Sequence, residues 1–156
     1  MPTSGMTFER QVMILRGFIV LSDFGRNPVH YKRVVNRLNV ACTQVSGSNS
    51  FFVGLGLLHQ VEEGTYLPTD CATAFYSELP GEEDYTKIQS CLRESDLYHL
   101  VRDNIRIRGA VSKNDIIDEI LRVSQTSVKA RAERAFEWLV RSELVEVSDN
   151  GMTKVH

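Results

Sequence analysis

The chain has 156 residues and a formal net charge of −2, and its hydrophobic (42%) and charged (24%) fractions are ordinary for a globular protein. This length fits one domain or two small ones. No stretch approaches the ~18 consecutive apolar residues of a membrane span, and the first residues lack the basic start and apolar core of a secretory signal. The slight negative charge argues against broad, non-specific binding of nucleic acids, although it does not exclude a local basic patch.

The cysteines and histidines show no spacing typical of a metal or catalytic site. Cys42, Cys71 and Cys91 are odd in number, far apart and include no CxxC pair. This argues against a disulfide framework or a zinc site and favours a reducing, cytoplasmic setting. The four histidines have no neighbouring Cys or carboxylate at metal-ligand spacing, and no GxSxG, HExxH or phosphate-binding glycine loop occurs. We therefore expect no enzyme, no catalytic residues, no metal and no cofactor.

The first eighty residues alternate between helical and hairpin patterns. Apolar residues at helical spacing predict a helix over 7–22, and Asn27 before Pro28 predicts the start of a second helix, with Asn27 as its N-cap. A third helix, of uncertain start, is expected to end near Leu58. Residues 60–62 and 65–67 predict a hairpin around Glu63-Gly64, and Thr69 is expected to cap one more helix.

Residues 80–84, Pro-Gly-Glu-Glu-Asp, are the one break in composition with linker character, so we expect a domain boundary there. A linker of five residues is short, so the two domains are expected to touch. The acidic residues of this stretch are expected to be solvated. Further helices are expected over 85–94 and after Ser95, followed by a short strand at 107–111.

The clearest pattern lies between Ser112 and Val155. Ser112 with Asp115 three residues later predicts a helix start, and a tight turn at 123–125 leads to a second helix over about 126–144. Residues 145–147 and 152–155 read as two strands, joined by Asn150-Gly151, which can supply the positive φ angles of a tight hairpin. Helix, turn, helix and β-hairpin in this order resembles the winged-helix superfamily.

The apolar pattern of the first half falls on that of the second when it is shifted by 82 positions. Val29 then falls on Val111, Leu38 on Ile120 and Leu58 on Val140. The match is one of pattern with little identity. We predict a mostly α chain with small β-hairpins (α+β), built as two tandem winged-helix domains over 1–80 and 85–156 with a short linker at 80–84.

In winged-helix proteins that bind DNA, the helix after the tight turn can enter the major groove. The resemblance therefore makes these residues of the predicted helix 126–144 candidates for DNA contacts: Ser127, Lys129, Ala130, Arg131, Arg134 and Arg141. Arginine can pair with guanine, serine can bond a phosphate, and a small alanine permits close approach. The alternative is a solvated helix face, on which Glu133 and Glu137 pair with arginines at helical spacing and would repel phosphate.

Further basic residues flank this predicted reading helix. Arg106, Arg108 and Lys113 belong to the densest basic run in the chain, which begins at Arg102 and could contact backbone phosphate beside the helix-turn-helix. Lys154 lies where a wing could reach phosphate. Solvated loop residues are the alternative interpretation of the basic run.

The third helix of the first half predicts a contact surface instead. Its presumed leading end, 46–50, carries no charge. Besides one apolar face toward its own domain, it carries a second, formed by Phe51, Leu55 and Leu58, which is expected to be covered by the other domain or by a second subunit. Trp138 lies off the inward face of its helix and is expected to be a contact residue too.

Two functions are compatible with these patterns. The first is a sequence-specific binder of double-stranded DNA, a small prokaryotic-type transcriptional regulator with the second domain as its main reader, which the base rate of the fold favours. The second is a winged-helix protein-interaction or assembly subunit that does not bind DNA, which the net charge and the uncharged end at 46–50 favour. The spare apolar surface indicates a homodimer or a protein partner, and no membrane contact is expected.

Overall fold

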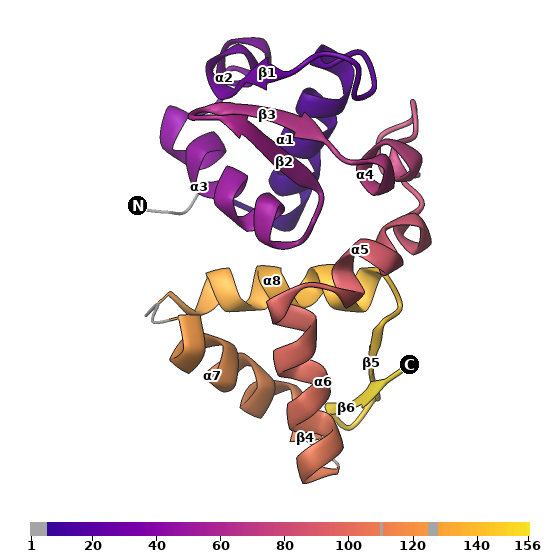
Figure 1. Cartoon of the computed structure of the whole chain (residues 1–156). Helices are drawn as coiled ribbons and strands as arrows, with labels where there is room; N and C mark the ends of the chain where they lie inside the picture. Colours follow the sequence, from indigo (N-terminus) through magenta and orange to yellow (C-terminus); the bar gives the residue numbers. More distant parts are fainter. Residues whose placement is uncertain (1–5, 110, 125–127) are drawn as a thin grey trace.

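A computed structural model describes residues 6–109, 111–124 and 128–156. These residues form a mostly helical chain with two small antiparallel sheets of three strands each, which confirms the α+β class (Figure 1). The first half contains α1 (Phe8–Leu21), β1 (Val29–His30), α2 (Tyr31–Leu38), α3 (Cys42–Gly54), β2 (Leu58–Glu62), β3 (Thr65–Pro68) and α4 (Asp70–Phe75). The second half contains the 3₁₀ helix η2 (Tyr85–Ile88), α5 (Gln89–Arg93), α6 (Asp96–Arg108), β4 (Val111–Ser112), α7 (Lys113–Ser124), α8 (Lys129–Arg141), β5 (Val145–Val147) and β6 (Met152–Val155).

The two sheets have the same strand order. In each sheet the last strand lies in the centre, which gives the orders β1-β3-β2 and β4-β6-β5. Both hairpins expected from the sequence are present, β2–β3 around Glu63-Gly64 and β5–β6 around Asn150-Gly151. Gly64 and Gly151 have φ angles of +77° and +82°, a region that residues with a Cβ atom rarely enter.

Side-chain caps fix the starts of three helices, and two of these caps, at Ser95 and Ser112, were predicted from the sequence. The hydroxyl of Thr7 accepts a hydrogen bond from the backbone N–H of Arg10 at α1, and Ser95 accepts one from Tyr98 at α6. Ser112 accepts a hydrogen bond of 3.1 Å from the N–H of Asp115 at the start of α7. Each cap satisfies a backbone donor that the helix itself leaves without a partner.

Three of the predicted element bounds are wrong. The second helix begins at Tyr31, not at Asn27-Pro28, because residues 29–30 pair with β3 and His30 acts as the N-cap. Residues 107–108 continue α6 and are not strand. Helix α3 ends at Gly54, so Leu58 opens β2.

Helix α8 lies between the two halves of the molecule (Figure 1). It crosses the middle of the view below α3, while α4 and α5 run down the right-hand side, where the chain passes from one half to the other. The buried apolar residues of both halves belong to a single hydrophobic cluster. The halves therefore share packed surface instead of hanging on a free linker. No helix in the described part of the chain has the length and apolar character that crossing a membrane requires.

The expectation that the acidic residues of 80–84 are solvated agrees with Glu82 and Asp84, which are exposed, but it is wrong for Glu83. Glu83 is buried, and its carboxylate accepts a hydrogen bond of 2.6 Å from the guanidinium of Arg16 on α1. The same guanidinium donates to the carbonyl oxygens of Ser77 and Glu78 and lies 4.6 Å from the ring centroid of Tyr76. Arg16 thus holds the segment after α4 against the first helix.

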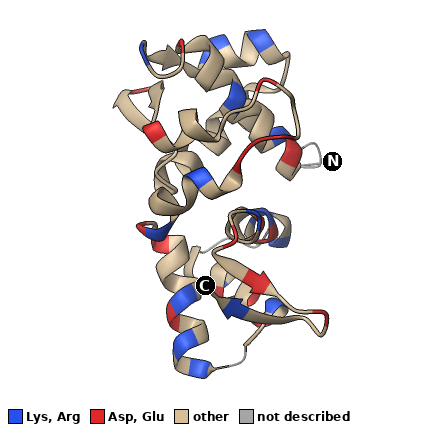
Figure 2. Cartoon of the chain, turned by 90° about the vertical axis from the view of Figure 1, so that its right-hand side faces the viewer, with Lys and Arg blue, Asp and Glu red and all other residues tan. Residues whose placement is uncertain are grey.

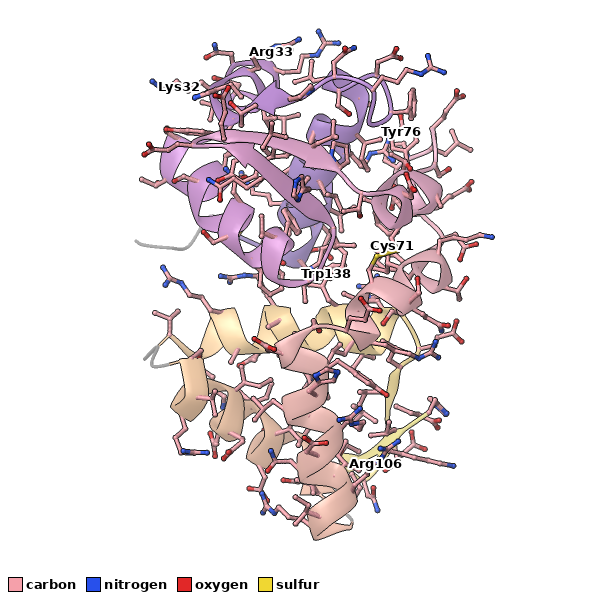
Figure 3. All side chains as sticks on the ribbon, viewed as in Figure 1. Lys32, Arg33, Cys71, Tyr76, Arg106 and Trp138 are labelled. Carbon is pink, nitrogen blue, oxygen red and sulfur yellow. A yellow bond between two sulfur atoms is a disulfide. The ribbon has the colours of Figure 1, made fainter. Side chains whose placement is uncertain are left out.

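A disulfide joins Cys71 on α4 to Cys91 on α5, so the expectation of no disulfide is wrong for these two cysteines, whereas Cys42 is free (Figure 3). The two Cα atoms lie 6.5 Å apart and the cysteines are separated by 20 positions in the sequence. A cross-link across a loop of this length stabilises a fold by about 3 kcal/mol in the chain-entropy model. The expectation of a cytoplasmic setting rested partly on the absence of a disulfide. The Cys71–Cys91 bond removes that argument.

Candidate functional site at the surface between α3 and α8

Helix α8 is the element on which the predicted DNA contacts depend, and it is buried along more than one side. Ala132, Ala135, Phe136 and Leu139 are buried, as is Trp138. The first four recur at the spacing of the face that turns toward α7 and the second sheet. Trp138 lies off that face and is nevertheless completely buried. A helix covered on two sides has a second packing partner.

The second partner of α8 is the first half of the chain. The ring centroid of Trp138 lies 4.9 Å from that of Phe8 on α1, 5.7 Å from Phe52 on α3 and 6.2 Å from Phe75 on α4. Its indole N–H donates a hydrogen bond of 2.8 Å to the side-chain oxygen of Gln11, which is itself buried. Trp138 is therefore the centre of an aromatic cluster between the halves (Figure 3).

Tyr85 completes this aromatic cluster from the start of the second half. Its ring lies 4.9 Å from Phe75 and 6.1 Å from Trp138, measured between centroids. Burial raises the pKa of Tyr85 to about 12, so its hydroxyl stays protonated near neutral pH.

Arg141, at the end of α8, is engaged by neighbours within the protein. Its Nε donates a hydrogen bond of 2.7 Å to Glu137, four residues earlier, and its guanidinium lies 4.8 Å from the ring centroid of Phe8. The hydrogen bond with Glu137 raises the pKa of Arg141. This helical ion pair is the one that the solvated-face alternative predicts. A DNA phosphate would have to compete with Glu137 for this side chain.

Arg134 points toward the first half. Its guanidinium is partly buried and donates a hydrogen bond of 3.3 Å to the backbone carbonyl of Met6, while its Nε is buried without a hydrogen-bond partner among the described residues. Burial, and then the charge of Arg131, lower the pKa of Arg134. A base contact from Arg134 would require α8 to separate from the first half.

The remaining candidate DNA residues lie on several parts of the surface. Lys129, Ala130 and Arg131 are exposed at the start of α8, and Lys154 is exposed on β6. Ser127 lies outside the residues that the structure describes. Within the basic run, Arg106 and Lys113 are exposed, whereas Arg108 pairs with Asp115 at 3.5 Å.

The structure places the basic run apart from α8. Arg106 lies toward the lower end of the molecule in Figure 3, whereas α8 crosses its middle. Lys and Arg are interleaved with Asp and Glu along both halves of the ribbon in Figure 2. Both halves of the chain therefore carry basic and acidic residues.

Phe51 and Leu55, two of the three apolar residues that the sequence singled out on the third helix, lie beside the space between α3 and α8. Phe51 is half-buried and lines two cavities there, and Leu55 is buried beside the second of them. The cavities have volumes of about 290 and 410 Å³. Leu58 is buried at the start of β2. The leading end of α3 therefore faces the α8 side of the molecule.

No family model, curated protein or solved structure matches the chain. The described residues also contain no group of three or more His, Cys, Asp or Glu side chains placed to hold a metal ion.

Two contacts of the structure, one in this site and one in the segment after α4, were missed in the sequence. Gln11 falls at helical spacing between Phe8 and Leu15, on the apolar face of the helix. A polar residue in that position indicates a buried hydrogen-bond partner, because buried polar groups are rarely left unpaired. The Arg16–Glu83 pair gave no such signal, because the two residues are 67 positions apart and each is ordinary where it stands.

Proposed function

We propose that the chain is a tandem winged-helix protein, with units over 1–80 and 85–156, that acts as a protein-interaction or assembly subunit and does not read DNA through α8. The winged-helix assignment is supported by the order helix, strand, helix, helix and hairpin, which occurs twice with the same strand order. The interaction role is the second of the two functions that the sequence allowed.

The observation that carries this proposal is the burial of Trp138 against the first half. A recognition helix must be free along one side to enter a major groove about 12 Å wide. Here the side of α8 that carries Trp138 and Arg134 contacts α1, α3 and Met6. Reading DNA with this side of α8 would first require breaking the aromatic cluster and the hydrogen bond to Gln11, and the exposed side carries the acidic Glu133.

The charge distribution supports the same proposal. Duplex DNA binding draws most of its affinity from phosphate contacts with Lys and Arg. Arg141 is paired with Glu137, Arg108 with Asp115, and the chain as a whole is acidic. DNA binding stays the second candidate because Lys129 and Arg131 are exposed and, within the described ranges, form no salt bridge.

A titration of labelled mixed-sequence duplex DNA at about 50 and 200 mM salt separates these functions. The proposal predicts no measurable binding by the parent protein at either concentration. A second experiment cross-links a tagged form of the protein in its source cells, treats the extract with nuclease and purifies the tagged protein. The proposal predicts that its protein partners are still recovered.

Three results of the DNA titration together would contradict the proposal. The parent would bind duplex at low salt, the double change of Arg131 and Arg134 to Ala would remove that binding, and Glu137→Gln would strengthen it by removing a repulsive charge. Partners lost on nuclease treatment would point the same way. Together these results would establish DNA binding through α8 and overturn the proposal.

A further inference from the structure

The smaller cavity between α3 and α8 is lined by two arginines and, among the described residues, by no acidic one. Its volume is about 290 Å³, near the lower end of the range for small-molecule sites. It is lined by Met6, Gln11, Thr43, Gln44, Gly47, Ser48, Phe51, Arg131 and Arg134.

Arg134 is the unusual member of this lining. A partly buried guanidinium normally pairs with a carboxylate, because burying an unpaired charge is costly. Within the described residues Arg134 forms no salt bridge, its one hydrogen bond goes to a neutral carbonyl, and its Nε has no partner. Arg131 lines the same cavity and adds a second positive charge, so it does not neutralise the charge of Arg134.

The rest of the lining divides into a polar and an apolar part. Thr43 and Gln44 come from the first turn of α3 and Ser48 from the next, and Ser48 is buried with its hydroxyl donating to the carbonyl of Gln44. Met6 and Phe51 supply apolar surface. Convergent cations beside an apolar wall match an organic anion better than a bare ion.

We propose that this cavity binds a small organic anion, with its phosphate or carboxylate group held by Arg134 and Arg131 and its apolar part against Met6 and Phe51. The oxyanion would supply the counter-charge that Arg134 lacks. A ligand in this position contacts α3 and α8 together, so its binding stabilises the arrangement in which the two halves are packed. The inference does not depend on the identity of any macromolecular partner.

Four small molecules test the site in a buffer without phosphate, sulfate or carboxylate ions. Their binding is measured by calorimetry and by the shift they cause in the midpoint temperature of thermal unfolding. Phenyl phosphate and benzoate carry the same ring with different oxyanions, inorganic phosphate lacks the ring, and benzamide lacks the charge. We expect phenyl phosphate or benzoate to bind and to raise the midpoint, with the better of the two identifying the head group. Inorganic phosphate is expected to bind more weakly, and benzamide not at all.

Arg134→Met is the informative variant, and Arg106→Met, an exposed arginine on α6, is its matched control. Losing a charge-assisted hydrogen bond is expected to weaken binding of the better probe by about tenfold or more in Arg134→Met. Binding should be unchanged in Arg106→Met. Without ligand, Arg134→Met is expected to unfold at the same or a higher temperature, because it removes an uncompensated charge.

Three results would contradict the site. The first is that the parent binds none of the anions, the second that benzamide binds as well as benzoate, and the third that Arg106→Met weakens binding as much as Arg134→Met. A lower unfolding midpoint for Arg134→Met, with no anion effect on the parent, would show that Arg134 only anchors Met6. None of these results bears on duplex binding, so this site and the proposed function fail separately.

Discussion

Replacing Trp138 with alanine is expected to lower the free energy of unfolding by about 3–5 kcal/mol, the usual cost of truncating a buried aromatic side chain. Trp138 is completely buried and contacts aromatic rings from α1, α3 and α4. The change leaves a cavity between the halves and removes the donor that satisfies Gln11. Urea unfolding followed by circular dichroism measures the loss.

Trp138→Phe is the matched control, because it keeps a ring and removes the N–H donor. The buried oxygen of Gln11 then lacks a partner, which is expected to cost about 1–3 kcal/mol. Combining Trp138→Phe with Gln11→Leu should recover part of that loss, since neither polar partner remains. A loss below about 1 kcal/mol for Trp138→Ala would contradict the packing described for α8.

Replacing Glu83 with alanine is the second change with a large expected effect. The side chains of Glu83 and Arg16 are 1% and 15% exposed, and their charged atoms lie 2.6 Å apart. Removing one member of a buried ion pair typically costs about 3–5 kcal/mol, because the other charge stays buried without compensation. Thermal and urea unfolding of Glu83→Ala should both show the loss.

Glu82→Ala serves as the control for this change, since Glu82 is the exposed neighbour and should alter stability by no more than about 0.5 kcal/mol. The double change Arg16→Met and Glu83→Leu should be less destabilising than Glu83→Ala alone, because no unpaired charge remains. Equal effects of Glu82→Ala and Glu83→Ala would show that residues 80–84 are the solvated linker that the sequence predicts.

Local patterns in the sequence were enough to predict the hairpins and the helix caps at Ser95 and Ser112, whereas Asn27 does not cap α2 and Thr69 makes no side-chain cap hydrogen bond. Asn150-Gly151 and the cap at Ser112 act over a few residues, so their signals are visible without knowledge of the fold. The start of α2 was misplaced because β1 has two residues and exists only through its pairing with β3. The Cys71–Cys91 disulfide was missed because sequence spacing does not show which cysteines meet.

The candidate site shows the same division between local and distant contacts. The position of Trp138 on its helix was sufficient to indicate a contact residue, since a large aromatic side chain lay off the inward face. Its partners could not be named, because Phe8, Gln11 and Phe52 are more than eighty positions away. The charges of Arg134 and Arg141 suggested DNA contacts, whereas the fold directs one toward Met6 and pairs the other with Glu137.

The fluorescence of Trp138 tests most directly whether α8 is packed against the first half, because this is the only tryptophan in the chain. In the folded protein we expect blue-shifted emission and little quenching by acrylamide, both unchanged when duplex DNA is added. Phe8→Ala, a change in the first half, should shift the emission to the red and increase quenching. Emission and quenching like those of the urea-unfolded chain, measured while circular dichroism still shows native helix content, would contradict the account.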